Sequence, residues 1–142
     1  LAPLLLVVLN PCVAESAGVA VLTACLADAT GPTARAAVLE MMRDDVGHAR
    51  VGWAHLASDR VPAGLRAALP TALPALLAAV RREYFARCDE LPERPPPGHG
   101  CAAPAAIRAA IDAALRDVVV PGFAHVGIEV APARRWLASE LA

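Results

Sequence analysis

Residues 10–60 read NPCVAESAGVAVLTACLADATGPTARAAVLEMMRDDVGHARVGWAHLASDR, and this stretch decides the fold. Its first half is apolar on nearly every side of a helix, and in its second half apolar residues recur at helical spacing. Between the halves, Asp28–Pro32 (DATGP) is a turn by composition, and Pro32 suits the first position of a helix. The stretch therefore predicts two helices, 10–27 and 32–58, packed as antiparallel neighbours. Asn10-Pro11 either forms the N-cap and first turn of the first helix or kinks a longer helix that begins near Pro3.

The rest of the chain predicts more helices and one long loop. The expected helices are 73–89, 105–119 and 132–141. Pro121-Gly122 should break or kink the chain after helix 105–119. The long loop is Leu91–Pro104, where three consecutive prolines exclude helix. The chain has 142 residues, of which 57% are hydrophobic, so it has the size of one domain and enough apolar side chain for a core. We therefore predict an all-α protein with a single helical domain, 1–142, in which 61–142 supply additional C-terminal helices.

Charge and cysteine content exclude some classes of function. The net charge is −1 and the 13 basic residues, all arginine, form no basic stripe, so nucleic acid is a poor partner. The four cysteines form no CxxC pair, and a reduced, cytoplasmic location is the simpler interpretation.

The apolar run at the start of the chain raises a membrane alternative. Leu1–Ala27 carries one charge, Glu15, but Pro3, Asn10 and Pro11 interrupt the run and no Arg or Trp marks its ends. The run also resembles the apolar part of a signal peptide, although no basic residues precede it. We expect no membrane span here.

The second predicted helix places a carboxylate within its apolar face. At about 100° per residue, Asp45 falls near the middle of the apolar arc, and His48 lies on the same side one turn later. A carboxylate does not enter a core unpaired, because its desolvation is too costly. Glu15 poses the same problem, since it is the only ionisable side chain other than cysteine before Asp28. Both carboxylates therefore need a partner.

Spacing brings these groups together. Glu15 lies 13 residues before Asp28, and Asp45 lies 13 residues after Pro32. Each carboxylate is then ~20 Å from the turn, at the same height in an antiparallel pair. Glu15, Asp45 and His48 can converge between the helices as two carboxylates and an imidazole, a ligand set suited to iron or manganese and also to zinc.

Three interpretations without a metal stay open. Asp45 and His48 can satisfy each other or pair with an arginine. Glu15 can point into water from the start of its helix. Asp44 can be a solvated neighbour with no role in the site.

Residues 10–60 resemble one helix pair of the ferritin-like superfamily, in which a helix bearing Glu is followed about 30 residues later by a DExxHA motif. Residues 44–49, DDVGHA, are similar to that motif, with Asp45 at the position of its Glu. The resemblance implies that Glu15, Asp45 and His48 bind metal, and that Asp44 supports the histidine from outside the ligand set. It also implies a ferritin-like bundle with a di-iron or manganese centre, and oxidoreduction with dioxygen or peroxide.

Two departures from the family pattern affect this expectation. Asp45 is one methylene shorter than Glu, which makes bridging two metals harder. A complete site needs a second Glu and a second ExxH, and 61–142 contain no E/D-x-x-H. A missing first helix pair or a second chain would then have to complete the bundle. Loss of the metal would leave a helical scaffold or interaction domain, which is the alternative function.

Overall fold

The computed structural model describes residues 8–141, and every regular element in this range is helical, which confirms the all-α class. The elements are the π-helix η1 (Leu9–Ala14), α2 (Glu15–Asp28), α3 (Pro32–Ala57), α4 (Ala63–Asp89), α5 (Pro104–Ala114), the π-helix η2 (Leu115–Val119), α6 (Val120–His125) and α7 (Ala131–Glu140).

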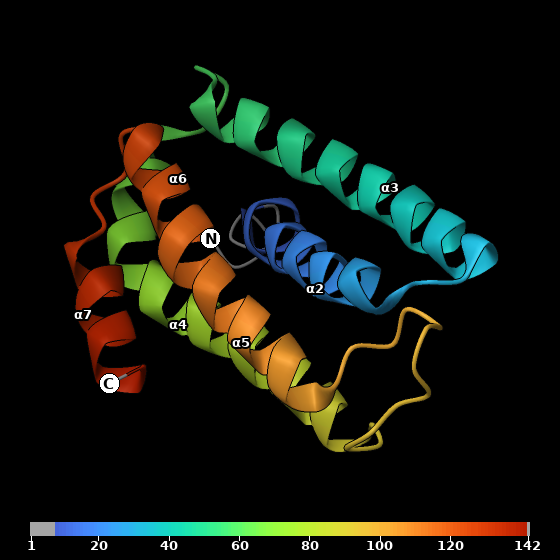
Figure 1. The fold of residues 1–142 in the computed structure, drawn as a ribbon. Helices are drawn as coiled ribbons and strands as arrows, with labels where there is room; N and C mark the ends of the chain where they lie inside the picture. Colours follow the sequence, from blue (N-terminus) through green and yellow to red (C-terminus); the bar gives the residue numbers. More distant parts are fainter. Residues whose placement is uncertain (1–7, 142) are drawn as a thin grey trace.

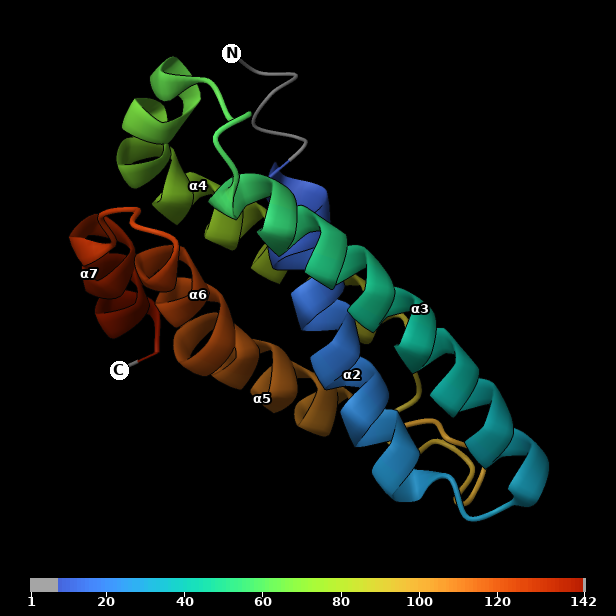
Figure 2. The ribbon, with the colours of Figure 1, turned by 90° about the horizontal axis from the view of Figure 1, so that it is seen from above.

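Helix α2 lies in the middle of the molecule (Figure 1, Figure 2). Helix α3 runs antiparallel to it on one side, as predicted, while α5 and α4 lie on the other side. Helix α7 packs against α4, and η1 contacts both α3 and α4. Because α3 contacts mainly α2 and η1, it forms an outer layer that leaves a groove along each side of α2.

The turn between α2 and α3 is held by the long loop 90–103. The Gly98 carbonyl accepts hydrogen bonds from the N–H groups of Thr30 and Gly31, at 3.2 and 3.3 Å. Asp28 Oδ2 accepts a hydrogen bond from the Gly100 N–H at 3.1 Å. Gly98 and Gly100 have φ of +84° and +73°, a region that favours glycine. The proline-rich loop thus fixes the end of the helix pair that lies opposite Glu15.

The core is built around one face of α4. Leu65, Leu69, Leu73, Leu77 and Val80 recur at helical spacing, and all five are buried. The largest buried side chains after α4 that join the same core are Ile111, Leu115, Val119, Val120 and Phe123. This core holds α4 and α5 together, and α2 packs against α5.

Helix α4 begins earlier than predicted. We expected a helix at 73–89 with at most a short turn before Pro70, but α4 spans Ala63–Asp89 and contains both Pro70 and Pro74. A proline inside a helix removes a hydrogen bond and costs about 3 kcal/mol. Burial of the leucine face described above offsets that local penalty, because it requires a continuous helix.

Two further prolines, Pro11 and Pro121, lie in or just after π-helical segments. Of the break or kink expected at Pro121-Gly122, the break is absent, because the chain stays helical from Pro104 to His125 through η2. Proline lacks an N–H group, and its ring crowds the carbonyl four residues earlier. The wider turn of a π-helix leaves room for that ring. Pro11 lies within η1, so the prediction of an N-cap at Asn10 is wrong. The alternative, a helix beginning near Pro3, falls outside the described residues.

Two helical stretches are long and apolar enough to cross a membrane, judged by length and composition alone. They are Asn10–Asp28 and Ala63–Asp89, and 28% of the apolar window in each is buried within the fold. Helix α4 was not expected to qualify, because the sequence predicted only its second half. The core helix of a soluble protein and a signal sequence near the N-terminus both meet the same criterion, so length and composition do not decide between these explanations.

Candidate metal centre

Glu15 is the first residue of α2, where the π-helix η1 ends. Its backbone position is fixed from two sides. The Tyr84 hydroxyl on α4 donates a hydrogen bond to the Ala14 carbonyl at 3.2 Å. On the other side, Pro11 of η1 packs directly against Gly52 of α3. Segments with π geometry are frequent at functional sites, and this one sets the direction of the Glu15 side chain.

The structure brings the three predicted residues together. One ligand atom from each of Glu15, Asp45 and His48 lies within 4.8 Å of the other two, and residues 8–141 hold no other such group of three or more His, Cys, Asp or Glu side chains. His48 Nδ1 lies 3.8 Å from Glu15 Oε2. The convergence inferred from the matched 13-residue spacing is therefore present.

The cluster lies at the side of the α2–α3 contact, not in a sealed core. The His48 side chain is 66% exposed and that of Glu15 is 24% exposed. Asp45, His48 and Tyr84 line a hollow of about 420 Å³ between α3 and α4. The prediction that Glu15 and Asp45 face a closed interior is wrong in this respect, because α3 contacts too little of α4 to close the groove. A ligand can reach the cluster from solvent.

Burial and the Asp45 carboxylate raise the pKa of Glu15, while the His48 imidazole opposes that rise. Two carboxylates this close favour retention of a proton on one of them unless a cation joins them. The pKa of Tyr84 is also raised, first by burial and then by the negative charge of Asp45. Both shifts record a local excess of negative charge in a partly desolvated hollow.

Two residues of this hollow had no predicted role in the site. At Gly18, a Cβ would lie 2.6 Å from Asp45 Oδ2 and 3.3 Å from the Tyr84 hydroxyl, so only glycine leaves space for both oxygens. Tyr84 of α4 lines the same hollow. Neither could be assigned from spacing, because both depend on how α4 sits against α2. Asp44 lines the hollow and is exposed, but within residues 8–141 it makes no hydrogen bond to His48, so its supporting role stays a prediction.

The donor set fits a hard or borderline cation. Two carboxylates and one imidazole suit iron or manganese, and zinc to a similar degree. Bonds of about 2.0–2.2 Å require ligand atoms closer than about 4.4 Å, so small side-chain rotations suffice for the three atoms to meet one ion. Three protein atoms leave coordination positions open for water or an oxidant. A second ion would need more ligands than 8–141 bring to this place.

No protein family, curated protein or solved structure matches the chain. Function therefore has to be inferred from the geometry of the site.

Proposed function

We propose that the protein is a ferritin-like metal-binding protein, and that Glu15, Asp45 and His48 bind iron or manganese. The observation that carries the proposal is the convergence of their ligand atoms within 4.8 Å at the edge of an open hollow. The DExxHA-like spacing and the helix pair support the ferritin-like assignment.

The reaction class that best suits this site is oxidoreduction. A bound iron or manganese ion would supply electron transfer to dioxygen or peroxide. Glu15 and Asp45 offer carboxylate oxygens that favour the cation, and His48 offers an imidazole nitrogen. The exposed side of His48 leaves the site open to a small oxidant. For a di-iron centre, we propose that further ligands come from a second chain or from another helix pair.

One observation favours the alternative, a helical scaffold or interaction domain with a degenerate metal site. His48 Nδ1 already faces Glu15 Oε2 at 3.8 Å, so the two side chains can form an ion pair without a metal. An ion pair this exposed contributes at most about 1 kcal/mol to the stability of the fold. The pair alone therefore does not explain why three such residues meet at one place.

Metal binding can be tested by thermal unfolding under anaerobic conditions. Fe²⁺ or Mn²⁺ should raise the melting temperature of the metal-free protein, because a ligand that binds only the folded state stabilises it. His48→Ala should remove most of that rise. His55→Ala is the matched control, since His55 is an exposed histidine two turns further along α3 and outside the cluster. Equal melting of wild type with and without metal would favour the scaffold.

The cytoplasmic location is likewise a proposal, and it makes a prediction about fractionation. Helix α2 carries Glu15, and the outer face of α3 is charged. Ionisable side chains are costly within a bilayer, so these features favour a protein surrounded by water over one that spans a membrane. After cell lysis the protein should stay in the supernatant of a high-speed spin without detergent. Recovery only in detergent extracts would instead assign the two apolar helices to a membrane.

A further inference from the structure

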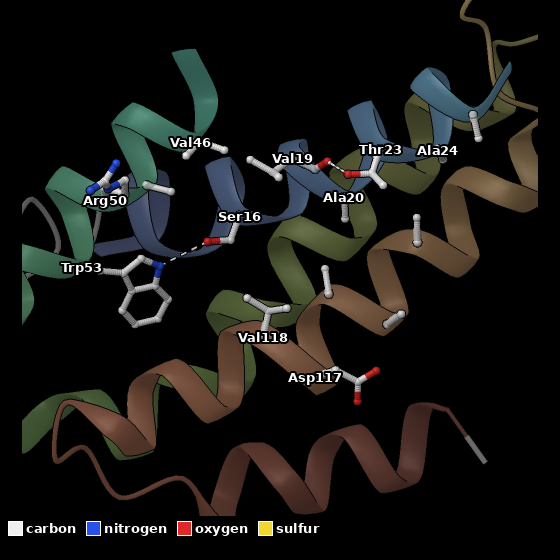
Figure 3. A pocket seen from close by; sticks show the side chains of 15 residues that line it. Ser16, Val19, Ala20, Thr23, Ala24, Val46, Arg50, Trp53, Asp117 and Val118 are labelled. Atoms are coloured by element: carbon white, nitrogen blue, oxygen red, sulfur yellow. Dashed lines mark hydrogen bonds between the residues drawn. The ribbon is translucent and has the colours of Figure 1, made fainter. Parts of the chain in front are cut away.

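An apolar trough lies on the opposite side of α2 from the metal centre. Figure 3 shows the side chains that line it. Helix α2 forms its floor, α3 forms one wall, and α5 with η2 forms the other. Its volume is about 740 Å³, within the usual range of small-molecule sites. Representative lining residues are Val19, Ala20, Ala24, Val46, Ala113 and Val118. These side chains offer no hydrogen-bonding group, so most of an occupant must be apolar.

One end of the trough is polar. Ser16 is 9% exposed, and its Oγ accepts a hydrogen bond from Trp53 Nε1 at 3.3 Å (Figure 3). A serine hydroxyl also has a proton to donate, and this proton finds no acceptor among residues 8–141. Thr23, further along the trough, instead donates to the Val19 carbonyl at 2.8 Å. A free donor is thus present at the Ser16 end.

The charges on the rim favour an anion at that same end. Arg50, on the α3 wall next to Trp53, forms no ion pair or side-chain hydrogen bond with the described part of the chain. Asp117 on the opposite wall is already neutralised by Arg116, which donates from Nε and Nη2 at 2.8 Å each. Among the described residues the rim therefore carries one uncompensated positive charge, on α3 one turn before Trp53, whose indole bonds to Ser16.

We propose that the trough binds an amphiphile with a carboxylate head and a single long apolar chain, such as a fatty acid. The head would lie at Arg50 and Ser16, and the chain would follow α2 towards Ala24 and Ala27. The α2 floor from Ser16 to Ala27 is ~16 Å long, which accommodates an extended alkyl chain. The site is separate from the metal centre, so it does not depend on the function proposed above.

Dodecanoate and dodecanol, titrated below the micelle concentration and followed by calorimetry and tryptophan fluorescence, test the proposal. Dodecanoate should bind once per chain, and dodecanol about tenfold more weakly, because hydrogen bonds to a charged group contribute more than neutral ones. Arg50→Ala should lower the affinity for dodecanoate to that for dodecanol. Arg43→Ala, on the same helix but paired with Glu40 outside the trough, should change neither affinity.

A second variant tests the place of binding. Ala20→Trp should fill the trough and abolish dodecanoate binding, whereas Val51→Trp, at an exposed position of α3 that does not line it, should leave binding intact. The molar mass of each protein in solution, with and without dodecanoate, completes the test. Equal affinities for the acid and the alcohol would overturn the proposal. So would a dimer that excludes dodecanoate and that Ala20→Trp converts to a monomer.

Discussion

Glu15→Gln should weaken the binding of Fe²⁺ or Mn²⁺ by more than about 100-fold without lowering the stability of the metal-free protein at pH 7. Removing a group that only supports a metal ligand already reduces affinity 10–100-fold, and this substitution removes a charged ligand oxygen itself. Calorimetric titration of metal into both proteins measures the loss. Glu40→Gln, an exposed glutamate of α3 paired with Arg43, is the control and should bind metal like wild type.

The effect on the metal-free protein follows from the direction of the Glu15 pKa. Burial and Asp45 raise it, so the folded state holds the proton more tightly than the unfolded state. The stability that a protonated Glu15 contributes at acid pH is lost as the pH rises past the ordinary pKa of glutamate and through the raised one. At pH 7 the ionised group then opposes folding, and a neutral glutamine relieves this. In urea unfolding, the free energy of unfolding of wild type should fall relative to that of Glu15→Gln as the pH rises from acid to neutral.

The two halves of this prediction separate the metal site from a structural ion pair. If Glu15 serves mainly to pair with His48, the glutamine variant should unfold more easily at neutral pH, and metal affinity should not change. Such a result would contradict the metal-centre proposal and favour the scaffold.

The helix pair and the meeting of its three polar residues could be predicted because both depend on local information. A turn of fixed composition between two periodic segments determines that the helices are antiparallel, and equal spacing from that turn determines which residues face each other. Glu15 and Asp45 are at matching heights for this reason, and the structure brings them together with His48.

The errors arose where contacts distant in sequence override local preference. Pro70 and Pro74 lower the helical propensity of their segment, yet the leucine face of α4 is buried only if the helix continues through them. The openness of the metal centre depends on how far α3 stands from α4, and one helix pair contains no information on that distance. Gly18 and Tyr84 belong to the hollow for the same reason. The ferritin-like resemblance itself stays a proposal that metal binding can test.

Gly52→Ala should destabilise the protein strongly, although alanine is the better helix former. An added Cβ at Gly52 would lie 2.4 Å from Cβ and 2.8 Å from Cγ of Pro11, and 3.1 Å from its backbone carbonyl carbon. A proline ring within a helix cannot rotate away, so α3 must move off η1. Overpacking of this kind costs about 1–3 kcal/mol. Gly47→Ala is the matched control on the same helix, since nothing lies within 4 Å of its added Cβ.

Gly47→Ala should raise the free energy of unfolding by about 0.5–1 kcal/mol, the usual gain of alanine over glycine inside a helix. The two variants should therefore differ by about 1.5–4 kcal/mol in urea unfolding, although the chemical change is the same. Gly52 follows His48 by four residues and Pro11 precedes Glu15 by four, so the shift of α3 should also separate the ligands. Gly52→Ala should then bind Mn²⁺ more weakly and Gly47→Ala should not. Equal stability of the two variants would mean that α3 does not approach η1 as closely as the Pro11 contact requires.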